Sequence, residues 1–174
     1  MCKIDGTVRE LCYYDFVKSA EAIAMQIKHS LGIDNGDTSS LRDRFIAIYL
    51  KRDIEYVLAQ FAIFLCGAAY LPLSDKLPDE RLAYILRDAK PKLIITTEDI
   101  KMRLVLEVAQ EMNADPDDWV EFFCVEDVDG IIDETNIPPH ERKVVDLNIN
   151  ELSRGLAGPK NLAYMIYTSG TTGK

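Results

Sequence analysis

Several features that mark other protein classes are missing from this sequence. It has no run of roughly 18 or more apolar residues, so it predicts no membrane-spanning helix. Its four cysteines form no C-x-x-C pair, which argues against a zinc site and against a redox dithiol. It has only two histidines, His29 and His140, which we expect to be exposed structural residues. No basic patch with interleaved aromatic residues occurs, so no nucleic-acid groove is predicted.

Signals of secretion are also missing. Charged residues interrupt the first thirty positions, which therefore do not form the apolar core of a signal peptide. No N-glycosylation sequon is present, and the cysteines have no disulfide-like spacing. These observations predict a reducing, cytoplasmic setting with no membrane partner.

What is present is the composition of one globular domain. The chain has 174 residues, of which 48% are hydrophobic and 28% are charged. This length is enough to bury roughly two-thirds of the unfolded surface. The net charge of −9 comes from one segment between Asp115 and Glu134, which holds nine acids and no Lys or Arg. We expect that segment to be a solvated surface, because clustered like charges repel one another and favour water.

Helical and strand patterns alternate along the chain. The helices are predicted from the spacing of apolar residues and the strands from short apolar runs. Gly32, Gly67 and Pro91 are expected to end the first three helices. Pro78 is expected to start the third helix at its first helical position, and Thr97 is expected to cap the fourth. The predicted helices run from Phe16 to Leu31, from Ile54 to Leu65, from Pro78 to Ala89 and from Glu98 to about Asn113, and the predicted strands are Phe45–Leu50, Ala69–Leu73 and Leu93–Thr97. Such alternation indicates an α/β fold, with a parallel sheet covered by helices.

The pattern weakens between about Ala114 and Lys160. Trp119–Val125 and Val144–Ile149 are each candidate strands, and the connection between them is irregular and mainly polar. No internal repeat or domain boundary is evident.

The strongest chemical signal lies at the end of the chain. The apolar stretch Leu162–Tyr167, a predicted strand, runs directly into Thr168-Ser169-Gly170-Thr171-Thr172-Gly173-Lys174. Glycines let a backbone approach a ligand closely, and successive N–H groups together with hydroxyls can hold an anion, of which phosphate is the obvious choice. The nucleoside-triphosphatase P-loop is not matched, because Thr168 stands where its first glycine should be.

A different family fits these residues better. YTSGTTGK, at 167–174, resembles the phosphate-binding motif Y-T-S-G-[ST]-T-G-x-P-K-G of the adenylate-forming superfamily, which includes acyl-CoA synthetases, luciferases and the adenylation domains of peptide synthetases. Leu162-Ala163-Tyr164 resembles the variant that is typical of adenylation domains.

Two upstream motifs occur in the order of the same family. Leu11–Phe16 resembles L-[TS]-Y-x-E-L, and Gly67–Leu73 resembles A-G-x-A-Y-[VL]-P-[LI]-D, followed by Pro78-Asp79-Glu80-Arg81 in place of P-x-E-R. Ser74 replaces the usual Asp and Cys66 the usual Ala. The resemblance covers roughly 8–97 and 160–174, and 98–160 looks like a variable, acidic segment.

The resemblance implies an activity. Members of this family activate a carboxylic acid with ATP and Mg as an acyl adenylate, and usually pass the acyl group to the thiol of coenzyme A or of a carrier-bound phosphopantetheine. It implies that residues 168–174 contact phosphate, with Lys174 at the variable, non-catalytic position. It assigns no catalytic residue and no metal ligand within the chain, and it favours an amino acid over a fatty acid as substrate, with a carrier domain as a possible partner.

The family's downstream motifs do not occur in these 174 residues. We therefore expect residues 1–174 to be an incomplete AMP-binding (adenylation) domain, the N-terminal portion of a larger enzyme, which is inactive alone. Two other interpretations remain open at this point: a non-catalytic remnant that binds a partner, and an unrelated nucleotide-binding α/β domain.

Overall fold

A four-stranded parallel sheet forms the centre of the molecule. The computed structural model describes residues 2–4, 7–9, 11–33, 39–108, 120–125 and 158–168. Neighbouring strands follow the order β4-β3-β5-β6. All three pairings are parallel, as the alternating pattern predicted. The strands are β3 (Phe45–Ile48), β4 (Ala69–Pro72), β5 (Leu93–Thr96) and β6 (Glu121–Cys124).

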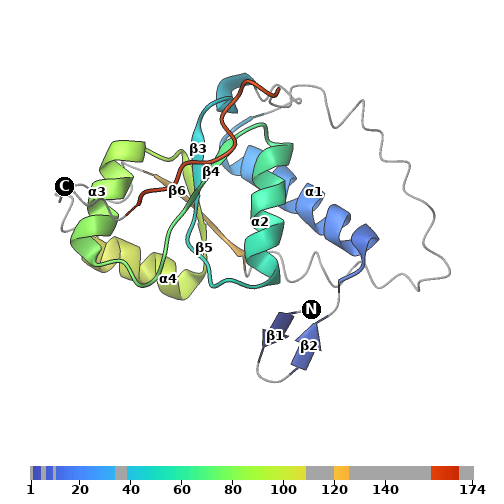
Figure 1. The fold of residues 1–174 in the computed structure, drawn as a ribbon, viewed down its shortest axis with the longest axis horizontal. Coiled ribbons are helices and arrows are strands. Elements are labelled where there is room, and N and C mark those ends of the chain that lie inside the picture. The colour runs from blue at the N-terminus through green and yellow to red at the C-terminus, as the bar shows by residue number, and fades with distance from the viewer. Residues whose placement is uncertain are drawn as a thin grey trace.

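Helices cover both faces of this sheet (Figure 1). On one face lie α1 (Tyr13–Ser30) and α2 (Ile54–Leu65), and on the other lie α3 (Asp79–Ala89) and α4 (Glu98–Arg103), which continues into the π-helical turn η2 (Leu104–Val108). Parallel strands need crossover connections, and the helices provide them. The α/β fold class expected from the sequence is therefore confirmed.

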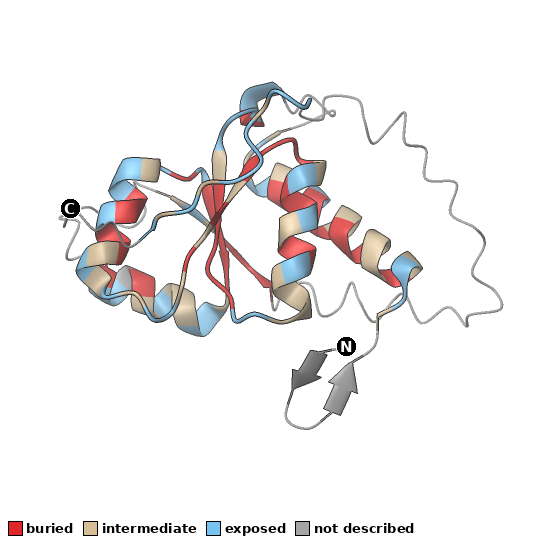
Figure 2. Cartoon of the chain, viewed as in Figure 1, coloured by how far each residue is buried: buried red, intermediate tan, exposed pale blue. Residues whose placement is uncertain are grey.

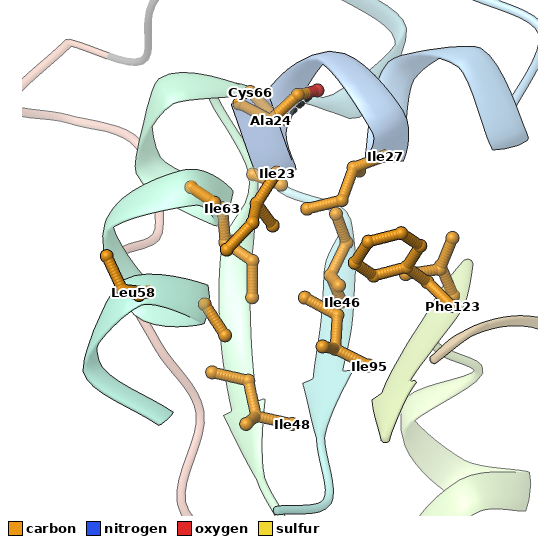
Figure 3. Packing of buried hydrophobic residues seen from close by; sticks show 14 of the residues in the cluster. Ile23, Ala24, Ile27, Ile46, Ile48, Leu58, Ile63, Cys66, Ile95 and Phe123 are labelled. Carbon is orange, nitrogen blue, oxygen red and sulfur yellow. Dashed lines mark hydrogen bonds between the residues drawn. The ribbon is translucent and has the colours of Figure 1, made fainter. Parts of the chain in front are cut away.

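The strands divide the core into two layers because successive side chains of a strand point to opposite faces. Ile46 and Ile48 of β3 pack with α1 and α2, whereas Ala47 and the following Tyr49 pack with α3 and η2. The sheet is buried from both sides (Figure 2). Figure 3 shows Ile23, Ile27 and Ile63 from the helices converging on Ile46 and Ile95.

Two glycines act as expected at helix ends. Gly32 follows α1 with φ +63° and Gly67 follows α2 with φ +74°, a region that favours residues without a Cβ. The α3 helix ends with Lys90 in the left-handed region, one residue before Pro91. Cys66, at the end of α2, is fully buried, as predicted for a small core residue.

The helix starts differ in detail from the sequence pattern, in which Phe16 is the first apolar residue of the first helix. The first helix begins at Tyr13 rather than Phe16, because the Cys12 sulfur accepts a hydrogen bond from the backbone N–H of Asp15 and caps it earlier. Pro78 is the cap of α3 rather than its first residue, since its ψ of 149° is extended. Thr97 does occupy the cap of α4, but its side chain makes no capping hydrogen bond.

Other differences concern whole elements. The helix expected from Glu98 to about Asn113 is α-helical only to Arg103 and then widens into η2, and residues 109–119 lie outside the described part. The strand predicted at Trp119–Val125 is present as β6, while Val144–Ile149 is not described. A short antiparallel hairpin of β1 (Cys2–Ile4) and β2 (Thr7–Arg9), and the 3-10 turn η1 (Ser39–Leu41), were not anticipated.

Among the described residues, no helix is both long and apolar enough to cross a membrane. His29 is exposed at the end of α1, as expected, whereas His140 lies outside the described residues. Of the nine acids of the 115–134 segment only Glu121 is described, and it is exposed.

Candidate functional site

The segment that leads into the glycine-rich motif runs along the outer edge of β4. Tyr164 pairs in parallel with Tyr70, whose N–H donates to the Ala163 carbonyl and whose own carbonyl accepts from the N–H of Met165, both at 3.1 Å. The two tyrosine rings stack with centroids 5.6 Å apart. The predicted strand Leu162–Tyr167 is thus reduced to one bridge, because the segment leaves β4 after Met165.

This pairing fixes the direction of the segment. Because the bridge is parallel, Thr168 is carried toward the same edge of the sheet as the carboxyl ends of β3 and β4. Open α/β sheets bind ligands at that edge. The glycine-rich motif therefore follows a segment that is directed toward a typical ligand-binding edge.

A second contact fixes the beginning of the segment. Asp43 follows η1 in the left-handed region with φ +56°. One of its carboxylate oxygens accepts a hydrogen bond from the backbone N–H of Leu162 at 2.8 Å, and both oxygens accept from the Asn161 amide at 3.2–3.3 Å. The turn before β3 thereby holds residues that are more than a hundred positions away in the sequence.

A third set of contacts comes from α3. Arg81 Nη2 donates to the Thr168 carbonyl at 3.4 Å, and its guanidinium carbon lies 5.1 Å from the centroid of the Tyr84 ring. Tyr84 meets Tyr167 edge to face, with centroids 6.5 Å apart. The Tyr167 hydroxyl donates to Asp88 Oδ2 at 2.5 Å. Residues 81, 84 and 88 lie on one face of α3 and contact the two residues that precede Ser169.

The environment of Tyr167 keeps its hydroxyl protonated. Partial burial, followed by the hydrogen bond to Asp88, raises the pKa of the Tyr167 hydroxyl far above its ordinary value of 10.0, and Arg81 opposes this only weakly. At neutral pH the hydroxyl is therefore a donor, which matches its contact with a carboxylate oxygen.

A cavity of about 610 Å³ opens beside this segment. Ile166 and Tyr167 line it, together with residues of β4, the residues that follow β3 and β4, and one residue each from α2 and α3. Its charged lining consists of three basic side chains, Lys51, Arg52 and Lys76, and one carboxylate, Asp75. In a chain of net charge −9, this local excess of positive charge favours an anionic ligand.

The crevice between β3 and β5, where the chain order of the strands reverses, is bridged by side chains. Thr96 Oγ1 donates to the carbonyl of Tyr49 at 3.1 Å, and Arg103 Nη1 donates to the Tyr49 hydroxyl at 3.3 Å. Arg103 also pairs with Asp79 at 2.5 Å and with Glu107 at 3.0 Å. The cavity beside Tyr167 lies at the carboxyl ends of β3 and β4.

The sequence-predicted phosphate contacts are only partly visible. Thr168 is exposed and lies beside Arg81. Ser169, Gly170, Thr171, Thr172, Gly173 and Lys174 lie outside the described residues, so their contact with phosphate stays a prediction. Among the described residues, no group of three or more His, Cys, Asp or Glu side chains is arranged to hold a metal ion.

Comparison with known proteins identifies the relationship. The sequence profile of the AMP-binding enzymes matches residues 2–174. The chain belongs to the AMP-binding enzyme family. The resemblance inferred from the glycine-rich motif and its two upstream partners is therefore confirmed.

Relatives in this family include peptide synthetases. The chain is 35% identical over 132 residues to the dimodular nonribosomal peptide synthase of Bacillus subtilis (strain 168), and 28% identical over 166 residues to tyrocidine synthase 1 of Brevibacillus parabrevis. These matches cover 76% and 95% of the chain but only 5% and 12% of the two relatives.

The fold is shared with a solved structure. The complex of VinN with 3-methylaspartate superposes with a TM-score of 0.58 at 17% identity, covering 92% of this chain and 37% of VinN. At that identity the similarity establishes the fold.

Sequence reasoning missed two groups that position the AMP-binding motif. Asp43 stands in a turn with no recognisable pattern around it. Tyr84 and Asp88 were not singled out, although with Arg81 they share the i, i+3, i+7 spacing of one helical face. That spacing was the available signal, but nothing in it indicated a partner 80 residues away.

Proposed function

We propose that this chain supplies the phosphate-binding part of a ligase that uses ATP to activate a carboxylic acid, with an amino acid as the favoured substrate class. The single observation that carries the proposal is the parallel pairing of Tyr164 with Tyr70, which directs the YTSGTTGK motif of an AMP-binding enzyme toward the carboxyl edge of the sheet. The basic cavity beside Tyr167 supports it, because phosphate is anionic.

The proposed reaction proceeds by displacement at phosphorus. The substrate carboxylate attacks the α-phosphorus of ATP, the bond to the bridging oxygen breaks, and pyrophosphate leaves with that electron pair. Residues 168–173 would hold the β- and γ-phosphates through backbone N–H groups and hydroxyls, orienting the leaving group and stabilising its charge. Mg, bound with ATP, would neutralise phosphate charge. The acyl group would then pass to the thiol of coenzyme A or of a carrier-bound phosphopantetheine.

We further propose that residues 1–174 form an incomplete adenylation domain with a variable acidic segment near 98–160, and that they do not catalyse the reaction alone. The support is that the relatives compared above extend far beyond the matched part. A non-catalytic, partner-binding role is the second candidate, which the absence of the family's downstream motifs from these residues favours.

The test is acid-dependent exchange of pyrophosphate into ATP. It compares the 174-residue chain with a longer protein in which the family's downstream motifs follow Lys174. We expect exchange in the longer protein only. Exchange by the 174-residue chain would overturn its proposed dependence on further residues, and no exchange by either protein with any amino acid or other carboxylic acid would favour the non-catalytic role.

Variants of the longer protein test the phosphate role. Thr171→Ala and Thr172→Ala should each lower exchange by about tenfold or more, because each removes a hydrogen-bond donor to a charged group. Their thermal stability should stay unchanged. Ser40→Ala, which removes an exposed hydroxyl from η1, is the matched control and should retain full exchange.

A further inference from the structure

We propose that Arg81, Tyr84 and Asp88 of α3, together called the α3 clamp, are positioning residues that set the conformation of the phosphate-binding loop. This inference rests on the proposed function. Among the described residues, the contacts of the α3 clamp reach as far as Thr168, the first of the predicted phosphate contacts. The clamp acts through Tyr167 and Thr168, the last two described residues before Ser169.

The segment is fixed at two places before it reaches Tyr167. Asp43 holds its beginning, and pairing with β4 holds Ala163 to Met165. The backbone then leaves the sheet, so no strand ladder fixes Tyr167 and Thr168. Arg81, Tyr84 and Asp88 of α3 contact these two residues, and the Tyr167 ring also packs against the core cluster on the α3 side of the sheet. The helix is thus the final support before Ser169.

The clamp restrains both ends of the Tyr167 side chain. Its ring packs edge to face against Tyr84, and its hydroxyl donates to Asp88 at the far tip. An aromatic ring that packs against a second ring and is hydrogen-bonded through its hydroxyl has little freedom to rotate. Since the pKa of the hydroxyl is raised by burial and by Asp88, the donor is retained across the physiological pH range.

Arg81 restrains the backbone instead. Its guanidinium donates to the Thr168 carbonyl while lying over the Tyr84 ring. Tyr84 therefore contacts both Arg81 and Tyr167, and it links the support of the side chain to the support of the main chain. The carbonyl of Thr168 belongs to the same peptide unit as the N–H of Ser169, so holding it orients the first N–H of the predicted loop.

Orientation matters because a loop of N–H groups stabilises phosphate charge only when the donors converge. Preorganised donors act without the cost of reorienting during binding, and displacement of about 1 Å can cost about a hundredfold in rate. Losing the clamp should therefore weaken binding of ATP more than it weakens binding of the acid.

The α3 clamp differs from a packing contact in the core because two of its side chains are exposed to solvent. Tyr84 is 44% exposed, and Asp88 is exposed as well. Exposed polar contacts of this kind contribute little to global stability. A change at the clamp should thus alter the loop without altering the unfolding temperature, which a role in the core would not do.

The first experiment measures hydrogen–deuterium exchange in the 174-residue chain. Asp88→Ala, which removes the acceptor, and Tyr167→Phe, which removes the donor, should each raise exchange in peptides covering 166–174 and leave the peptides of β3 and β5 unchanged. Glu80→Gln, which removes the same charge from an exposed position of α3, and Tyr13→Phe, which removes a hydroxyl from an exposed tyrosine, are the controls. If hydrogen–deuterium exchange at 166–174 is unchanged in both the Asp88 and the Tyr167 variant, the inference is overturned, whether or not the chain binds nucleotide.

The second experiment measures the KM for ATP in the longer protein. The Asp88 variant and Tyr167→Phe should each raise the KM for ATP by about three- to tenfold, which is the loss expected for one hydrogen bond. The KM for the acid and the melting temperature should stay unchanged. Both variants break the same hydrogen bond. The double variant should therefore raise the KM for ATP no further than the more severe single variant does. If the unmodified protein shows exchange but the variants match Glu80→Gln, the inference fails and the proposed function stands. If the unmodified protein shows no exchange, the proposed function fails and the deuterium measurement alone decides on the clamp.

Discussion

Asp43 and Leu162 are joined by a hydrogen bond of 2.8 Å although 119 positions separate them in the chain. The contact ties the turn before β3 to the start of the segment that carries the AMP-binding motif. Asp43 has a left-handed backbone, and its carboxylate accepts hydrogen bonds from Asn161 and Leu162 at the start of the segment. A surface turn thus positions one end of the candidate site.

Asp43→Ala should loosen that end of the segment. The substitution removes the acceptor for Leu162 and Asn161 and places a Cβ without a polar group in the left-handed region, so we expect a loss of about 1–2 kcal/mol in the free energy of unfolding. Asp43→Asn, which tolerates the same backbone and keeps one acceptor oxygen, should lose about half as much or less. Urea unfolding monitored by circular dichroism measures both. Equal stability of the alanine variant and the parent would contradict the anchoring role.

Asp53, the cap of α2, predicts a pH dependence of stability. The pKa of Asp53 is raised from 3.8 to about 6. The largest cause is partial burial, and a hydrogen bond with the Glu55 side chain and the repulsion of its charge add to it. The folded protein therefore binds this proton more tightly than the unfolded chain. The carboxyl contributes stability below about pH 4, and the contribution is lost as the pH rises through about 6.

Asp53→Asn, which remains a good helix cap, should remove this dependence. Because Asp53 is only partly buried, solvent screens its charge, and we expect the variant to gain less than about 1 kcal/mol at pH 7.5. It should gain nothing at pH 4. Unfolding curves of the variant and the parent at the two pH values measure this gain in the free energy of unfolding. An equal effect of the substitution at both pH values would refute the assigned pKa shift.

Cys66 should be inert in the folded protein. Its side chain is fully buried against α1, where the thiol donates to the carbonyl of Ala24, and burial raises its pKa from 9.0 to about 12. The thiolate is the reactive form, so alkylation at pH 8 should be slowed by about a thousandfold from the pKa alone. Mass spectrometry after iodoacetamide treatment should find Cys12, which is exposed, modified first. Comparable modification of Cys66 without denaturant would show that this part of the core opens.

The sequence was informative wherever a local pattern determines the structure. Apolar spacing located α2, and continuous apolar runs located β3 and β5, because a buried parallel sheet requires them. Helix boundaries were less accurate. The Cys12 cap and the widening of α4 into η2 depend on individual side-chain contacts, such as that of Arg103 with Glu107, which periodicity does not reveal.

The candidate site shows the same division. The glycine-rich motif indicated the family without any structure, because its residue types suit phosphate binding. The supports of that motif could not be read from the sequence, since Asp43 and Asp88 act on residues that are 119 and 79 positions away. Such pairs become visible only when the order of strands is known, which places the 158–168 segment beside β4 and α3.

The proposed function depends on the claim that the motif at residues 168–174 binds the phosphates of a nucleotide. Nuclear magnetic resonance tests this claim directly. Amide resonances of the ¹⁵N-labelled chain would be followed during titration with pyrophosphate and, separately, with ATP and Mg. The account predicts saturable shifts of the amides of Ser169 to Gly173 and of residues around Tyr167, which Thr171→Ala and Thr172→Ala would weaken. Saturable shifts confined to other parts of the chain, or none at millimolar nucleotide, would contradict it.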